Sequence, residues 1–191
     1  MSKTLKIVLI VAAVIGVITL FILMGGIGAY NKVVTMDEAV SSQWAQVENQ
    51  LKRRYDLIPN LVATVKGYAK HEKELFENIA EARTKYFKAP TVNDKVQAAN
   101  KLEGFLSRLL VLRETYPQLK ANRSFLKLQD SLEGTENRIA VERKRYNDAV
   151  RVLNTYRRTV FGRFFAALAG VEKAQYYEIP DAEKATPTVK F

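Results

Sequence analysis

The sequence predicts an all-α protein in which an N-terminal transmembrane helix precedes an elongated antiparallel bundle of three to four helices. An uncharged apolar run comes first, and apolar residues at helical spacing follow for most of the chain. Almost no run of alternating apolar and polar residues remains from which a sheet could be built. The 191 residues include no cysteine, which excludes disulfides, thiolate metal sites and a cysteine nucleophile.

The apolar run over residues 7–31 predicts a membrane anchor. It offers about 25 positions without a charge, and a helix needs about 20 to cross the hydrocarbon layer. The short basic N-terminus, residues 1–6, resembles the start of a signal peptide, so cleavage after Ala29 is the alternative. A signal core is usually only about 7–15 residues long. We therefore expect the segment to be retained as an anchor.

The basic residues near this segment predict its orientation. Lys3 and Lys6 precede it, whereas Lys32 stands alone after it and is followed by Asp37 and Glu38. Basic residues are retained on the cytoplasmic side of a membrane. We expect a single pass through the cell membrane, with the N-terminus in the cytoplasm and the body outside. The reverse orientation stays open, because a second basic run begins about 20 residues further on.

Residues 32–171 are predicted to form the helical bundle, and its first helix is long. From Met36 to Lys88 the apolar residues recur at heptad spacing, which buries one side of a helix. Pro59 lies within this range and removes a backbone donor. The pattern resumes in register after it, so we expect a kink near Asp56–Pro59 rather than a break.

Residues that start or end helices define the remaining elements. Thr91, after Pro90, is an N-cap candidate for a second helix over residues 92–115, which Tyr116-Pro117 would end. A third helix is predicted from about Phe125 to Val160, so the three long helices would run up, down and up. A brief fourth helix is expected at residues 164–168, and residues 172–191 are expected to form an extended tail.

Two charged residues interrupt the apolar stripe of the first helix. Arg54 and Glu72 are too far apart along a helix to pair with each other. An unpaired buried charge is costly, so each should meet an opposite charge on the third helix. Glu142 and Arg138 are the candidate partners. Four helical asparagines are expected to form hydrogen bonds between helices: Asn60, Asn137, Asn147 and Asn154.

Two long runs carry a resemblance to a known family. One is LKRRYDLIPNLVATVKGYAKHEKELFENIAEAR at Leu51–Arg83, and the other is LQDSLEGTENRIAVERKRYNDAV at Leu128–Val150. With the ending at Tyr176-Tyr177-Glu178 and residues 185–191, they resemble the LemA family over nearly the whole chain. The resemblance implies a transmembrane helix with an antiparallel bundle and no established enzymatic activity. Some members of the family resemble factors that act in bacterial membrane remodelling or that are encoded beside membrane proteases, so the resemblance implies a role of this kind.

Residue types that carry chemistry are sparse. His71 is the single histidine, and one imidazole cannot build a metal site without further ligands, so a solvated surface position is expected. The glycines of Gly25-Gly26-Ile27-Gly28 lie in the apolar run and lack the context of a phosphate loop. They are better suited to close packing between neighbouring anchors. We expect no catalytic residue, no metal site and no cofactor.

Two groups of residues are candidates for contacts with partners. The basic group would meet an anionic surface or an acidic partner, although most such charges are simply solvated. Its members are Lys52, Arg53, Arg143, Lys144, Arg145, Arg157, Arg158 and Arg163. The apolar group would contribute to assembly, and its members are Phe161, Phe164, Phe165 and Leu168.

These features favour a non-enzymatic membrane scaffold that self-associates at the bacterial membrane, in membrane organisation or remodelling. Its expected partners are membrane lipid and further copies of the chain. The alternative is an adaptor or regulator that binds a membrane protein, such as a membrane protease. Nucleic acid is not an expected partner, because no pattern of base-stacking aromatics accompanies the arginines.

Overall fold

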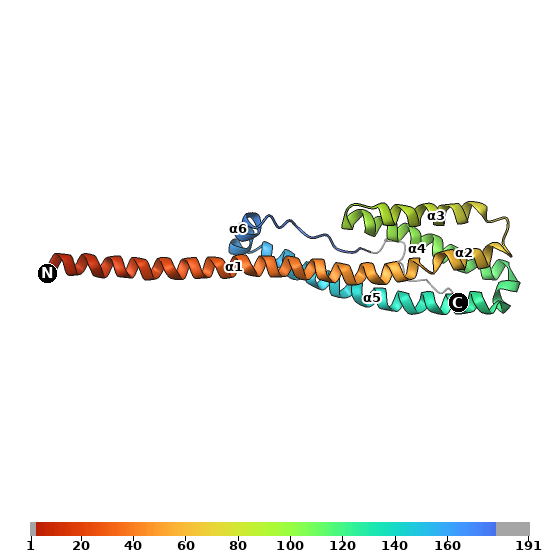
Figure 1. The fold of residues 1–191 in the computed structure, drawn as a ribbon, viewed down its shortest axis with the longest axis horizontal. Helices are drawn as coiled ribbons and strands as arrows, with labels where there is room; N and C mark the ends of the chain where they lie inside the picture. Colours follow the sequence, from red (N-terminus) through yellow and green to blue (C-terminus); the bar gives the residue numbers. More distant parts are fainter. Residues whose placement is uncertain (1–2, 179–191) are drawn as a thin grey trace, which may run out of the picture. The chain divides into compact units, whose positions relative to one another are not determined.

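A computed structural model describes residues 3–178, with the backbone alone for residues 3–8 and Val11. Every regular element within this range is a helix, as the sequence predicts (Figure 1). The chain divides into two compact units. Within the described range, the anchor unit comprises residues 3–42 and 149–174, and the bundle unit comprises residues 43–148 and 175–178.

The first helix, α1, runs from Lys3 to Tyr55 without interruption and carries the predicted anchor. It is the one helix within the described range that is long and apolar enough to cross a membrane. The large apolar side chains described between Leu9 and Met24 are exposed. Exposure of this kind suits a helix surrounded by lipid.

The anchor unit pairs α1 with the end of α5 (Arg123–Arg157) and with α6 (Val160–Leu168). Lys32 lies over the ring of Tyr156, 4.9 Å from its centroid. Gly26 faces Phe165, whose ring would lie 3.5 Å from an added Cβ atom. Gly26 precedes Lys32 in α1, whereas its partner Phe165 follows Tyr156 in the chain, so α1 and α5–α6 are antiparallel here. The brief helix predicted at residues 164–168 is present as α6, and it begins earlier, at Val160.

The bundle unit contains the end of α1, α2 (Ile58–Lys66), α3 (Lys73–Lys88), α4 (Val92–Thr115), the short 3-10 helix η1 (Pro117–Ala121) and most of α5. Side-chain pairs define its directions. Glu48 and Arg54 of α1 meet Lys95 and Glu103 of α4, so these helices are parallel. Trp44 meets Tyr146 of α5 while Arg54 meets Glu136 of α5, so those two helices are antiparallel.

Helices α3 and α4 pack together as an antiparallel hairpin, so the bundle has four alternating legs (Figure 1). The expected bundle of three long helices running up, down and up is therefore wrong, because the structure has a fourth leg. The helix predicted over residues 36–88 is two legs of the bundle rather than one kinked rod.

Two breaks divide the predicted first helix. At the first, Pro59 occupies the first turn of α2, where its missing N–H has no intrahelical partner to lose. The second, at Gly67–Glu72, was not predicted, and it reverses the chain. Ala69 is fully buried within it, and Glu72 becomes the cap residue of α3. The interruption of the apolar stripe at Glu72 was the signal of this turn.

The predicted bounds of the second helix are confirmed, whereas the third helix ends at Arg157 rather than at Val160. Helix α4 spans Val92–Thr115, and the Thr91 hydroxyl accepts a hydrogen bond from the Asp94 amide at 3.1 Å. The Tyr116-Pro117 pair ends it. The core of the bundle unit lies along the predicted stripes, and its fully buried members include Leu51, Leu61, Ile79, Leu102, Leu106, Leu132 and Ile139.

Candidate functional site

A buried charge cluster occupies the centre of the bundle unit. Arg54 is 7% exposed, and its guanidinium pairs with Glu103 of α4 and Glu136 of α5, each at 2.7 Å. It also donates a hydrogen bond to the carbonyl of Leu132 at 3.0 Å. Three acceptors from two helices therefore offset the cost of burying this charge. Together they join α1, α4 and α5 at one level.

Arg143, one of the residues predicted to contact a partner, belongs to the same cluster. It is 9% exposed, lies over the ring of Tyr177 at 4.7 Å from the centroid, and reaches Glu136 at 3.8 Å. The segment that carries Tyr177 follows α6 and covers Arg143. No spacing along the chain connects these two residues, so the sequence offered no signal of the contact.

Arg54, Glu103 and Arg143 are shielded from water, whereas the Glu136 side chain is 43% exposed, and the pKa values near the shielded groups reflect their burial. Burial raises the pKa of Glu103 to about 7, although Arg54 acts to lower it. Burial also raises the pKa of Tyr177 to about 12 and that of Tyr55 well above its ordinary value. Both phenols are neutral at physiological pH. These groups face one another across the core, which favours a structural role over acid–base chemistry on a substrate.

The predicted partners of the two interrupting charges are only partly correct. Arg54 does meet a glutamate of the third long helix, but it is Glu136, because Glu142 pairs instead with Arg145 at 2.8 Å. Glu72 lies in a turn, where the Tyr116 hydroxyl donates to it at 3.4 Å. Its proposed partner Arg138 is exposed.

Asparagines of α5 fasten the segment that follows α6. The Asn154 amide donates to the Ala174 carbonyl at 2.8 Å and accepts from the Ala174 amide at 3.1 Å. Asn147 makes the same pair of bonds with Tyr177, at 3.1 and 2.8 Å. The expectation that these two residues join helices is therefore wrong: they hold an extended strap, residues 171–178, along α5. Of the tail predicted over residues 172–191, residues 179–191 lie outside the described range.

The rest of the basic group lies nearer the surface. Lys52, Arg53, Arg158 and Arg163 are exposed, and Arg157 is half-buried. Lys144 pairs with Asp148 at 3.2 Å and Arg145 with Glu142, each within α5. Contact of these residues with an anionic surface stays a prediction.

The apolar group lies on α6. Phe161, Phe164 and Leu168 are exposed, and Phe165 is half-buried against Gly26. Part of the group thus makes an intrachain contact with the anchor helix. The remaining side chains form a free apolar surface.

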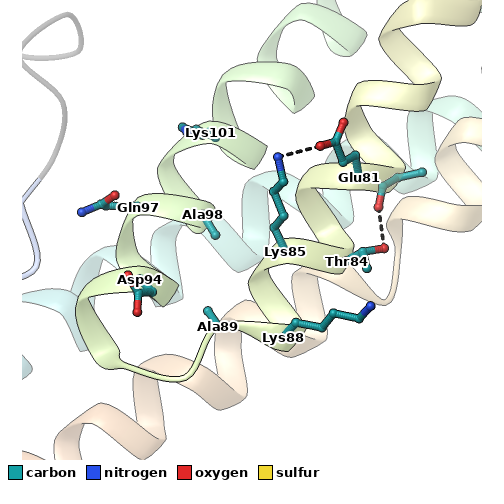
Figure 2. A pocket seen from close by; sticks show the side chains of 10 residues that line it. Glu81, Thr84, Lys85, Lys88, Ala89, Asp94, Gln97, Ala98 and Lys101 are labelled. Atoms are coloured by element: carbon teal, nitrogen blue, oxygen red, sulfur yellow. Dashed lines mark hydrogen bonds and ion pairs between the residues drawn. The ribbon is translucent and has the colours of Figure 1, made fainter.

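A pocket of about 660 Å³ lies between α3 and α4. Figure 2 shows Lys85 and Lys88 on one wall and Asp94 and Lys101 on the other. Lys85 donates to Glu81 at 2.6 Å, and this bond lowers the pKa of the Glu81 carboxyl. Within residues 3–178 no group of three metal-ligating side chains converges, here or elsewhere. His71 is exposed, as expected.

Comparison with known proteins places these features in a family. Residues 43–191 match the model of the LemA family. The chain is 25% identical over 175 residues to the proteins named Magnetosome protein MamQ 2 and Magnetosome protein MamQ 1 of Paramagnetospirillum magneticum. It is 22% identical over 174 residues to Magnetosome protein MamQ of Magnetospirillum gryphiswaldense. Each match covers 78% of this chain and 64% of the relative, so the chain spans less than two thirds of these proteins.

Proposed function

The chain belongs to the LemA family, and on that premise we propose that it is a non-enzymatic scaffold, anchored in the bacterial membrane by α1 and able to self-associate there. Its role would be in membrane organisation or remodelling. The similarity to proteins named for the magnetosome supports this proposal, because those names refer to a cellular structure and to no reaction.

The continuity of α1 carries the proposal. One helix of 53 residues contains both the apolar run and the first leg of the bundle, with no loop between Asn31 and Trp44. At about 1.5 Å per residue, the 25 uncharged positions extend about 37 Å, more than the roughly 30 Å of hydrocarbon. Among the described residues, nothing covers the exposed apolar side chains of this run, which supports burial in lipid.

Self-association would begin along the anchor helix. Gly25 and Gly28 have no atom within 4 Å of an added Cβ, unlike Gly26, which Phe165 covers. Small exposed residues let membrane helices approach closely and gain van der Waals contact. The orientation we propose leaves the N-terminus in the cytoplasm, because Lys3 and Lys6 precede the span and Lys32 alone follows it closely.

An adaptor for a membrane protein, such as a membrane protease, is the second candidate. It is favoured by exposed basic residues on the bundle unit, Lys52 and Arg53, and by the pocket between α3 and α4. Charged surface residues of this kind steer a partner of opposite charge.

Cross-linking in intact cells separates the two candidates, because the chain has no cysteine of its own. Single cysteines at Gln43, Lys88 and Arg163 are treated with a thiol cross-linker, and the products are identified by mass. A scaffold gives ladders of self-adducts from at least one position. One dominant foreign protein with no self-adduct would overturn the scaffold and establish the adaptor. The unmodified chain is the control and should give no product.

A further inference from the structure

The exposed surface of α6 is strongly apolar for a helix outside the predicted span. Phe161 is 72% exposed, and Phe164 and Leu168 are each 64% exposed. Val160, at 85%, extends the same surface. Single exposed apolar residues need no explanation, but four neighbours on nine residues form a patch that a partner should cover.

The patch occupies one sector of α6. At about 100° per residue, these four side chains fall within an arc of about 100°. Gly162 and Ala166, which are buried against the rest of the anchor unit, lie on the opposite side. Phe165 lies between the two sectors, and Arg163 lies outside the apolar arc. The helix therefore presents a buried side, an apolar side and a polar edge.

The contact between Phe165 and Gly26 determines the depth of this patch. Gly26 lies within the uncharged run, six residues before Lys32, or about 9 Å along the helix. If the run is centred on the bilayer, Gly26 is about 10 Å from the midplane, inside a hydrocarbon half-thickness of about 15 Å. The apolar side of α6 is then surrounded by whatever surrounds that end of the anchor.

The charges near α6 suit the headgroup region. Between Ala149 and Ala174 there are five basic residues and one acidic residue. Arg158 and Arg163 are exposed; Arg158 precedes the patch in sequence, and Arg163 lies between Phe161 and Phe164. An interfacial helix combines an apolar face, buried about 5–10 Å below the headgroups, with basic residues at the level of anionic lipid.

We propose that α6 is a second membrane-contacting element, which inserts Phe161, Phe164 and Leu168 into the leaflet that surrounds the Gly26 end of α1. The proposal rests on the proposed function, since it requires α1 to span the bilayer. It assigns the apolar patch to lipid rather than to a second copy of the chain, because Phe165 holds α6 against the lipid-facing anchor.

Depth-dependent fluorescence quenching tests the assignment on the full chain. Single-cysteine variants Phe164→Cys and Leu168→Cys are labelled with an environment-sensitive dye and reconstituted into vesicles of phosphatidylcholine and phosphatidylglycerol. We expect emission at short wavelength, strong quenching by lipids spin-labelled near the headgroup, and weak quenching by aqueous iodide. Val111→Cys is the matched control, because Val111 is an exposed aliphatic residue of the bundle unit. Its label should be quenched by iodide and not by the lipids.

Two further measurements distinguish a failure of the proposed anchor from a failure of the lipid assignment of α6. A label at Ile18→Cys, within the span, should be quenched by lipids spin-labelled deep in the chain. If it is not, the proposed anchor is wrong and the lipid assignment of α6 fails with it. If Ile18 is quenched but Phe164 and Leu168 remain open to iodide, the anchor stands and the α6 assignment is overturned. Loss of the apolar environment on dilution to one chain per vesicle would assign the patch to a second copy instead.

Discussion

Arg54 illustrates how a helical bundle can keep a charge in its core. Its guanidinium has two carboxylates at 2.7 Å and a backbone carbonyl at 3.0 Å, all from helices other than its own. Pairs of this kind contribute little compared with an apolar core, but removing one partner leaves the other charges buried and unpaired. The cluster therefore specifies which helices meet, and at which level.

Replacing Arg54 tests this role. We expect Arg54→Met to lower the free energy of unfolding by about 3–5 kcal/mol, because Glu103 then loses its opposite charge inside the core. The change is measured by urea titration in detergent, followed by helical circular dichroism. Lys144→Met is the matched control, since it removes an exposed ion pair of α5 and should leave stability nearly unchanged. Equal effects of the two changes would contradict this role of Arg54.

The raised pKa of Glu103 predicts a pH dependence of stability. Below pH 4.5 the Glu103 carboxyl is protonated in both the folded and the unfolded state. Between pH 4.5 and about pH 7 the unfolded state loses this proton while the folded state keeps it. The free energy of unfolding should therefore fall as pH rises through this window, by about 3 kcal/mol from this group. Glu103→Gln should show a shallower fall when both proteins are titrated with urea from pH 4 to 8. Identical slopes would contradict the pKa assigned to Glu103.

At the scale of elements, local signals predicted most helices correctly. The bounds of α4 follow from a capping threonine and a terminal Tyr-Pro pair, and the burial of α5 follows from its apolar spacing. The turn at Gly67–Glu72 was not predicted, because the apolar pattern resumes after it as if the helix continued. A heptad pattern identifies a buried face, and it does not say whether the chain reverses between two turns.

The buried cluster and the strap were beyond prediction for a different reason. Their contacts join residues far apart in sequence, such as Arg143 with Tyr177 and Asn154 with Ala174. Asparagine amides that bind a backbone leave no periodic signal, because the partner is a peptide group of any residue type. Sequence reasoning could identify Arg54 as a buried charge but could not choose Glu103 and Glu136 as its partners.

The asparagine contacts predict local changes in hydrogen exchange. In Asn147→Ala the Tyr177 amide loses its acceptor and should exchange faster, and in Asn154→Ala the Ala174 amide should do so. Asn137→Ala is the control, because Asn137 is exposed on the same helix. Exchange measured by mass spectrometry on the strap peptide should respond to the first two changes alone. Unchanged protection in both variants would mean that other contacts hold the strap.

The turn between α5 and α6 depends on Gly162. A Cβ atom there would lie 1.9 Å from the carbonyl oxygen of Tyr156, so Gly162→Ala must displace the start of α6. We expect a loss of stability and faster exchange of the α6 amides. Gly104→Ala provides the contrast, since an added Cβ meets nothing within 4 Å in the middle of α4. That change should stabilise the protein by about 0.5–1 kcal/mol in the same urea titration. A stabilising Gly162→Ala would contradict the described turn.

At the scale of the whole molecule, the sequence predicted a long apolar N-terminal helix and a helical bundle, and both are present. What it could not show is that they share one helix, or that α6 contacts the anchor through Phe165 and Gly26. The apolar residues of α6 were expected to serve assembly. Their position beside the uncharged run favours lipid, and it leaves self-association to the anchor helix.

The exposed glycines of the anchor predict how copies meet. Gly25→Leu combined with Gly28→Leu should reduce the yield of self-adducts in the cross-linking experiment, because the larger side chains hold neighbouring helices apart. Ile22→Leu keeps the volume of an exposed residue on the same helix and should leave the yield unchanged. An undiminished yield in the double variant would place the contact elsewhere on the chain.

Counting copies in native membrane shows whether the chain is a self-associating membrane scaffold. The full chain, fused to a fluorescent protein and expressed at its natural level, is extracted with its surrounding lipid in polymer-bounded discs, and bleaching steps are counted for each disc. We expect discs with several steps, and fewer steps for the Gly25→Leu and Gly28→Leu double variant. Discs that hold single copies throughout, for both proteins, would contradict the proposed scaffold.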